Sequence, residues 1–228
     1  MSIILYTVIA LIFSAILHEY MHGWVAFRLG DSTARDAGRL TLNPLAHIDL
    51  FGSIILPLLL VFSNSPFFLA WAKPVPYNPY NLQDQKYGDL KVAVGGPGIN
   101  FILAILFGVF ARFLPVSYFL KQSLVVNYFQ GNYDFLLGQM NGSFLKSLFV
   151  MLMIACFINL LLMIFNLIPI PPLDGSKVLI AFLPYDWRIK ILRLEPFGIF
   201  IVLFLLVLGL FNLIYYPILF LFSLITGL

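Results

Sequence analysis

Long apolar runs alternate along the chain with short polar stretches that are rich in glycine and proline. Three of these runs, residues 2–29, 90–114 and 142–167, are apolar along most of their length. An α-helix rises about 1.5 Å per residue, so runs of this length can reach across the roughly 30 Å hydrocarbon layer of a bilayer. The pattern predicts three membrane-crossing helices.

Two further apolar stretches are interrupted. A proline and a Ser-Asn-Ser-Pro sequence break residues 50–71 into pieces that are too short to cross a bilayer comfortably. Residues 196–228 are apolar throughout, and Asn212 or Pro217 is expected to kink this stretch or to divide it in two. The chain is therefore predicted to be an all-α integral membrane protein with about five to six membrane segments, folded as a single domain over residues 1–228.

The polar stretches favour short extended elements. Residues 39–42 alternate polar and apolar side chains, which is compatible with a short strand and equally with a plain connecting loop. Residues 72–80 contain three prolines, which forbid a helix and allow only an edge strand or a polyproline conformation. Residues 116–142 are mixed and rich in aromatic side chains, as is typical of a membrane interface.

Composition supports the membrane assignment. Of the 228 residues, 61% are hydrophobic and only 10% are charged, whereas about a quarter of a soluble domain is charged. The first apolar run has no Lys or Arg before Arg28, so it lacks the basic start of a signal peptide and is expected to be retained. The single cysteine, Cys156, excludes an intrachain disulfide and a cysteine-rich zinc site.

The strongest chemical signal lies inside the first apolar run, where residues 18–22 read His-Glu-Tyr-Met-His. On a helix, His18 and His22 are one turn apart on the same face and can reach one zinc ion. Glu19 can then act as the general base that activates water. A buried polar network is the competing explanation, but ionisable groups inside a membrane span are costly and usually functional.

A zinc site needs a third protein ligand. The best acidic candidate is Asp174, which follows the run 142–167 directly, although Asp174-Gly175 taken alone is a common turn dipeptide. Asp174 can meet the two histidines only if residues 2–29 and 142–167 cross the membrane in the same direction. That requires residues 50–71 to form a re-entrant hairpin, which irregular backbone permits where it is buried in protein.

The distribution of basic residues supports the same topology. With a re-entrant hairpin, the other side of the membrane carries only Arg112, Lys121 and Lys146. By the positive-inside rule, the candidate site and the short extended elements then lie toward the cytoplasm and the N-terminus lies outside. The basic residues on the site's side are Arg28, Arg35, Arg39, Lys73, Lys86, Lys91, Lys177, Arg188, Lys190 and Arg193.

Several motifs together resemble the site-2 proteases, which are intramembrane zinc metalloproteases. They are the His-Glu-x-x-His sequence at 18–22, Gly-Pro-Gly-Ile-Asn at 96–100, and the stretch 166–175 from Asn through Pro to Asp-Gly. Residues 38–49 and 71–76 also look like those of small prokaryotic members. The match covers most of the chain, without an inserted PDZ or nucleotide-binding (CBS) module.

The resemblance implies a zinc ion held by His18, His22 and Asp174, with Glu19 activating water. It also implies that the substrate is a transmembrane protein, cut at a peptide bond in or near its membrane segment. Gly175 is expected to supply the tight bend that lets the carboxylate of Asp174 reach back.

Other residues near these motifs have two interpretations each. Asn100 and Asn166 could bind the substrate backbone or stabilise an oxyanion, or they could be helix caps or packing groups. His47 could lie close behind the metal ligands or gate the site, but a plain loop role is the simpler interpretation. The glycines within residues 95–98 most simply allow close helix approach.

Two rival functions remain open from the sequence. One is a membrane zinc-binding protein or carrier without protease activity, although no internal repeat of the kind found in transporters is present. The other is a membrane zinc hydrolase that acts on prenylated C-termini or lipids. The net charge of +3 is small and dispersed, so no nucleic-acid partner is expected. A multi-pass location in the cell membrane is expected, and a homo-oligomer is compatible with the sequence.

Overall fold

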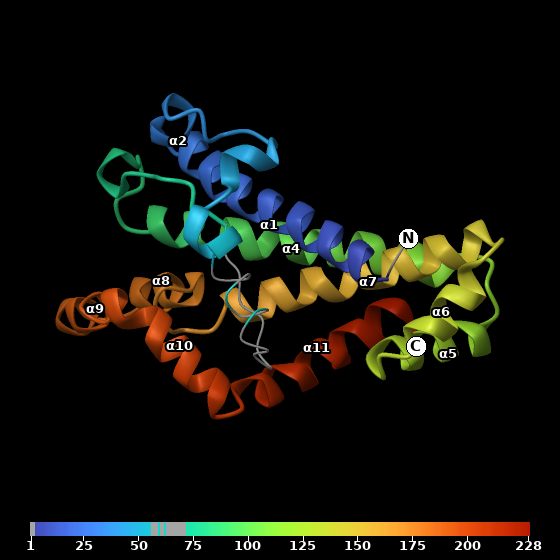
Figure 1. Ribbon diagram of the computed structural model, residues 1–228. Helices are drawn as coiled ribbons and strands as arrows, with labels where there is room; N and C mark the ends of the chain where they lie inside the picture. The colour runs from blue at the N-terminus through green and yellow to red at the C-terminus, as the bar shows by residue number, and fades with distance from the viewer. Residues whose placement is uncertain (1–2, 56–58, 60–61, 63–71) are drawn as a thin grey trace. The chain divides into compact units, whose positions relative to one another are not determined.

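The computed structural model describes residues 3–55, 59, 62 and 72–228, and every regular element among them is helical (Figure 1). Three long helices, α1 (Ile3–Arg28), α4 (Gly88–Phe113) and α7 (Phe144–Asn166), are long and apolar enough to cross a membrane. They coincide with the three uninterrupted apolar runs, so the all-helical class and the three candidate membrane-spanning helices are confirmed.

The remaining elements are shorter. Residues 116–142 form the two helices α5 and α6. Of the two interpretations of residues 39–42, the connecting loop is confirmed and the strand is wrong, because these residues have no regular secondary structure. The short helices are α2 (Thr33–Asp36), η1 (Pro44–His47), η2 (Leu50–Ile55), η3 (Pro79–Asn81), α5 (Tyr118–Phe129), α6 (Tyr133–Met140), α8 (Asp174–Ala181), α9 (Tyr185–Leu192) and η4 (Glu195–Phe197).

The last apolar stretch forms two helices, α10 (Gly198–Val207) and α11 (Leu210–Thr226). The break lies at Gly209, whose φ of 87° is left-handed and therefore favours glycine. The prediction placed the break at Asn212 or Pro217, but Pro217 lies inside α11. Most of residues 50–71 lie outside the described part of the chain, so the re-entrant hairpin and the total of five to six segments stay predictions.

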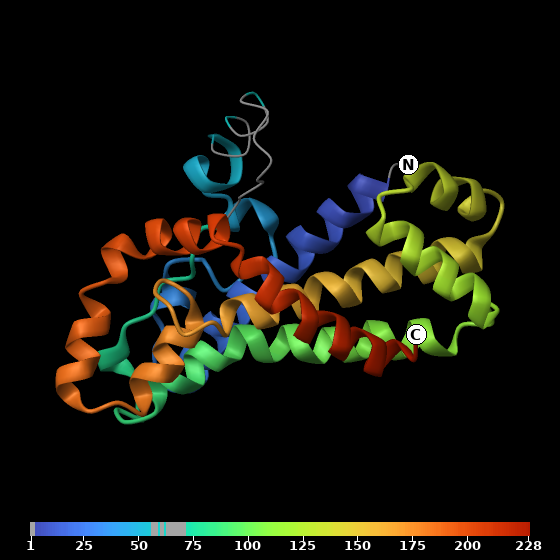
Figure 2. The same cartoon turned by 90° about the horizontal axis from the view of Figure 1, so that it is seen from below.

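The chain forms two compact units, and the boundaries between them fall within α1 and α4. The first unit comprises Met1–Ser14 and Pro97–Leu228. Its core surrounds α7, where Phe149, Met153 and Leu160 have no exposed surface, and α11 lies alongside α7 in both views (Figure 1, Figure 2).

Within this unit α4 runs antiparallel to α7. Asn100, at the middle of α4, bonds to Asn159 in the last third of α7. At the other end, the Nζ atom of Lys121 donates to the carbonyl of Arg112 at 2.6 Å and lies 5.7 Å from the centre of the Phe149 ring. The end of α4 is thereby held close to the start of α7.

The second unit comprises Ala15–Gly96. Its small core contains Ala26, Leu82 and Val92. The start of α4 lies close against the last half of α1, because a Cβ atom at Gly95 would be only 3.2 Å from the carbonyl oxygen of Met21. The expected role of a glycine in close helix approach is confirmed here, whereas nothing lies within 4 Å of a Cβ built on Gly98.

Candidate metal centre

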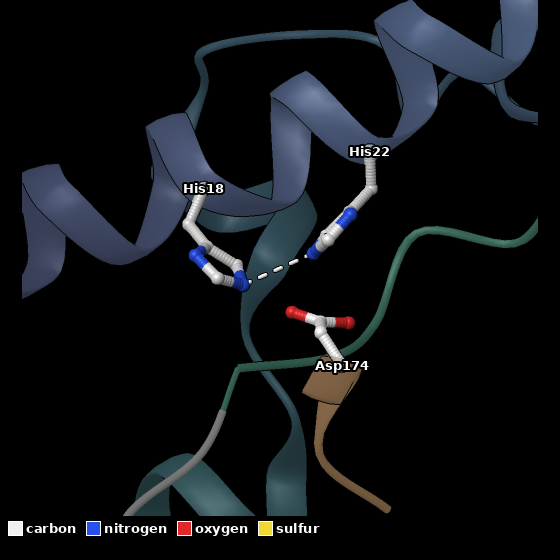
Figure 3. A group of neighbouring side chains, drawn as sticks. All are labelled: His18, His22 and Asp174. Carbon is white, nitrogen blue, oxygen red and sulfur yellow. Dashed lines mark hydrogen bonds between the residues drawn. The ribbon is translucent and has the colours of Figure 1, made fainter. Parts of the chain in front are cut away.

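The histidines of the His-Glu-x-x-His sequence point at one another from consecutive turns of α1 (Figure 3). Their Nε2 atoms are 3.0 Å apart, and the ring centroids are 4.6 Å apart at an interplanar angle of 82°. His18 is buried, with 6% of its surface exposed. Two nitrogens that converge in this way can bind one metal ion on the same side of the helix.

The other ring nitrogen of His22 fixes which nitrogen can bind a metal. Nδ1 of His22 lies 2.7 Å from the backbone carbonyl oxygen of Val92 in α4. A carbonyl oxygen only accepts hydrogen bonds, so Nδ1 carries the proton and donates it. The lone pair is then on Nε2, which faces His18, and this is the arrangement that metal-binding histidines usually adopt. The two histidines therefore fit a zinc ion.

Gly96 in α4 leaves the space that these two rings use. A Cβ atom at this position would come within 2.6 Å of Nε2 of His18 and would be closer still to Nε2 of His22. Real Cβ atoms do not approach other atoms so closely, and the imidazoles would have to move. The glycine therefore lets the two imidazole nitrogens converge.

If the two imidazoles bind zinc, Gly96→Ala is expected to lower zinc affinity by at least tenfold, because moving a metal-binding ring should cost at least as much as removing the group that orients it, which costs about 10–100-fold. Gly98→Ala is the matched control, since the same change in the same helix meets open space there. The measurement is the zinc affinity of the two purified variants. Equal loss in both would assign the effect to the folding of α4 and not to the imidazoles.

Glu19 lies between the histidines in sequence, and its carboxylate is bonded to the backbone of a distant segment. Its Oε2 atom accepts a hydrogen bond from the backbone N–H of Val75 at 2.9 Å. Val75 belongs to the proline-rich stretch 72–80, of which residues 72–78 form no helix, as predicted, whereas residues 79–80 belong to the helix η3, so the prediction is wrong there. A carboxylate has two oxygens, and this bond uses one of them.

Asp174 is the first residue of α8, on the short segment that follows α7. An acidic side chain is favourable there, because the N-terminus of a helix carries partial positive charge. Gly175 does not form the tight bend that the sequence suggested, since its φ is not positive and it lies within α8. A Cβ at Gly175 would overlap the carbonyl oxygens of Leu167 and Ile168, so this glycine allows α8 to lie against the end of α7.

Asn100 belongs to a buried polar network between three helices. Its Nδ2 donates to Oδ1 of Asn159 in α7 at 2.8 Å, and Nδ2 of Asn159 donates to Oγ of Ser14 in α1 at 2.8 Å. None of the three side chains has more than 1% exposed surface. The network ties α1, α4 and α7 together, and a role of Asn100 in substrate binding stays a prediction.

The other two candidates are engaged locally. Nδ2 of Asn166 donates to the carbonyl oxygen of Leu162, one turn earlier in α7, at 2.9 Å. Nε2 of His47 lies 2.8 Å from the carbonyl oxygen of Thr41 and, as this is an acceptor, donates to it. These contacts hold a helix end and a loop, and any part in substrate binding or gating stays a prediction.

Sequence reasoning missed Asn159 and Val75. Asn159 had a signal, because it is an amide within a strongly apolar run and such groups seldom face lipid. Val75 had none, because it contributes only its backbone N–H. The structure thus describes a helical membrane protein whose first long helix carries two converging histidines and a tethered glutamate.

The comparisons with known proteins agree with this class. Residues 6–209 match peptidase family M50. A protein of Bacillus subtilis (strain 168) named "Putative zinc metalloprotease YwhC" is 35% identical over 92% of this chain and 84% of its own length. "Putative zinc metalloprotease Rip2" of Mycolicibacterium smegmatis is 26% identical over 85% of this chain and 63% of its own length. No solved structure matches the chain.

The chain therefore belongs to peptidase family M50, the site-2 proteases. It is an intramembrane metalloprotease whose cofactor is zinc. The resemblance inferred from the motifs is confirmed, and nothing in these comparisons favours a carrier.

Proposed function

We propose that His18, His22 and Asp174 bind the zinc ion of this protease and that Glu19 is its general base. One observation carries the ligand set. A ring nitrogen of each histidine and a carboxylate oxygen of Asp174 all lie within 4.8 Å of one another (Figure 3). Two histidines, one carboxylate and an open position for water are a familiar donor set for catalytic zinc.

Zinc supplies Lewis acidity, which polarises a carbonyl and makes water a better nucleophile. The residues of this chain orient the metal ligands and transfer the proton. The Nδ1 proton of His22 is bonded to the Val92 carbonyl, which leaves the lone pair of Nε2 available for the metal. Glu19 takes a proton from the attacking water and later delivers it to the leaving amine, while the Val75 N–H holds its Oε2 atom.

The substrate class follows from the position of the motif. His18 and Glu19 lie in the last half of a helix that is long and apolar enough to span a membrane. A peptide bond that reaches them must itself be at or near membrane depth. We therefore assign a transmembrane protein as the substrate, cut in or near its membrane segment after local unwinding, because a helical peptide bond is already hydrogen-bonded.

The distribution of basic residues supports a site that opens toward the cytoplasm, with the N-terminus outside. Two positions test this orientation. Leu45, which follows α1, is 74% exposed, and Phe119, which follows α4, is 82% exposed. Single-cysteine variants at these positions are clean reporters once the buried Cys156 is replaced by serine.

In sealed, right-side-out vesicles, a membrane-impermeant maleimide is expected to label Phe119→Cys and not Leu45→Cys, and inverted vesicles should give the opposite result. The reversed pattern would contradict the orientation. With a re-entrant hairpin, the chain crosses the membrane once between these two positions. Labelling of both positions from the same side would mean an even number of crossings and would contradict the hairpin.

The activity itself is tested in liposomes that hold the purified protein and a synthetic single-span peptide. Cleavage is expected within or next to the apolar segment, should stop on zinc chelation and should return with added zinc. A zinc flux across the same liposomes without cleavage would favour the carrier instead.

A further inference from the structure

Residues 73–78, called the strap below, pass the catalytic glutamate and are held at several points. At one end, the N–H of Lys73 donates to the carbonyl of His47 at 2.9 Å, and Nη2 of Arg39 donates to the carbonyl of Lys73 at 2.8 Å. In the middle, the N–H of Val75 donates to Glu19. At the other end, the N–H of Asn78 donates to Oδ2 of Asp31 at 2.8 Å.

The sequence of the strap leaves one donor for the glutamate. Pro74 and Pro76 have no N–H, so Val75 provides the N–H between them. Proline also restricts the residue before it to extended conformations, which limits the backbone at Lys73 and Val75. A small shift of the strap therefore cannot replace the Val75 contact with that of an adjacent residue.

The side chain of Val75 fits against α1 where that helix has no side chain. A Cβ at Gly23 would lie 2.8 Å from Cγ1 of Val75 and 3.2 Å from the Cβ of Ala34. Val75 is 7% exposed. The strap is thus packed as well as hydrogen-bonded at the point where it meets Glu19.

Asp31 is the charged group that holds the far end of the strap. Its side chain has no exposed surface. Oδ1 accepts from Oγ1 of Thr33 at 2.5 Å and from Nδ2 of Asn81 at 2.9 Å, while Oδ2 accepts from the Asn78 N–H. Burial by itself would raise the pKa of Asp31, but the bonds from Thr33, Asn78 and Asn81 outweigh it, so the pKa is lowered. The carboxylate is ionised at neutral pH.

We propose that Asp31 is a positioning residue for Glu19. Its carboxylate fixes the strap at Asn78, the fixed strap keeps the Val75 N–H on Oε2, and that bond holds the glutamate in one orientation for proton transfer. A buried carboxylate that accepts several hydrogen bonds is a rigid anchor, because detaching any one donor leaves a charged group poorly solvated. The catalytic part of this proposal rests on the function proposed above.

Asp31→Asn is the direct test. An amide with its NH₂ group at the Oδ1 position would face three present donors, the N–H and hydroxyl of Thr33 and Nδ2 of Asn81. Turned the other way, the NH₂ group faces only the Asn78 N–H. The second orientation loses fewer hydrogen bonds, so the strap is expected to detach at Asn78. Asp36→Asn is the matched control, since Asp36 is the last residue of the nearby helix α2, is exposed and bonds to Ser32 and Arg35 instead.

The first readout needs no substrate. The amide hydrogen of Val75 is expected to exchange with solvent at least tenfold faster in Asp31→Asn than in the wild type, and at the wild-type rate in Asp36→Asn. Unchanged exchange at Val75 in Asp31→Asn would overturn the proposal, whatever the protein is found to cleave.

The second readout is kinetic, with a quenched fluorescent single-span peptide in liposomes. Asp31→Asn is expected to lower kcat on the order of tenfold or more, with KM and zinc content unchanged, because misplaced catalytic groups cost rate rather than binding. Val75→Pro, which removes the donated N–H, should lower kcat similarly, and the double variant should be no worse than Val75→Pro alone. Additive losses would mean that Asp31 does not act through Val75.

Asn81→Ala is the second variant if Asp31→Asn does not fold, because Asn81 is exposed and donates only one of the bonds to Asp31. It should lower kcat in the wild-type background and leave Val75→Pro unchanged. Loss in both backgrounds, or in neither, would overturn the proposal. A wild type that does not cleave at all would defeat the proposed function, and the exchange readout would still decide whether Asp31 holds the strap.

Discussion

Glu19→Gln is expected to leave the protein folded and loaded with zinc but without peptidase activity. Glutamine has the size of glutamate and a carbonyl oxygen that can still accept the Val75 N–H, so the local contact survives. It cannot take a proton from water at neutral pH. A positioned general base contributes on the order of 10²–10⁴-fold to a rate, and the cleavage rate should fall by at least that amount.

The sequence offers a matched control for this change. Glu195 is the only other glutamate of the sequence, and it lies in the exposed helix η4. Glu195→Gln makes the same chemical change and should cleave at the wild-type rate. Cleavage of a single-span peptide and zinc content are measured on the same preparations. Undiminished proteolysis in Glu19→Gln would refute the assignment of the general base, and loss of zinc would mean that the residue contributes to the metal site instead.

The long helices could be predicted because their cause is local. Helices α1, α4 and α7 each consist of more than twenty mostly apolar residues, and in a bilayer such a run must satisfy its backbone groups within itself. The shorter elements could not be predicted in this way. Residues 116–142 form two helices because Leu124 and Leu136 are fully buried in the core around α7, which depends on residues distant in the sequence.

The residues of the site show the same difference between local and long-range causes. His18 and His22 could be predicted from their spacing, because a helix alone brings them onto one face. Val75 could not, since the contact joins backbone and side chain across 56 positions of sequence. The role of Asp31 could not be predicted either, because an acidic residue after a helix is typical of a loop. Only its burial and its bonds to Asn78 and Asn81 distinguish it from an ordinary loop residue.

Asp174→Asn is expected to lower zinc affinity by more than about 100-fold. Removing a group that only orients a metal ligand costs roughly 10–100-fold, and removing the ligand itself should cost more. A neutral amide is a much weaker zinc ligand than a carboxylate, and two histidines alone leave the ion poorly held. Peptidase activity should fall in parallel and return in part at high zinc concentration. Metal bound per chain is measured after equilibration with buffered zinc.

Asp186→Asn is the control that distinguishes the loss of a metal ligand from the weakening of a helix. Asp174 and Asp186 both lie in the first turn of an eight-residue helix, α8 and α9 respectively, and each favours its helix by about 0.3–1 kcal/mol through the helix dipole. If zinc loss came from a weakened helix, both variants would lose it. If Asp174 is a ligand, only Asp174→Asn does, because the loss of a metal ligand is specific to the residue that carries it. A full complement of tightly bound zinc in Asp174→Asn would place the third ligand elsewhere in the chain.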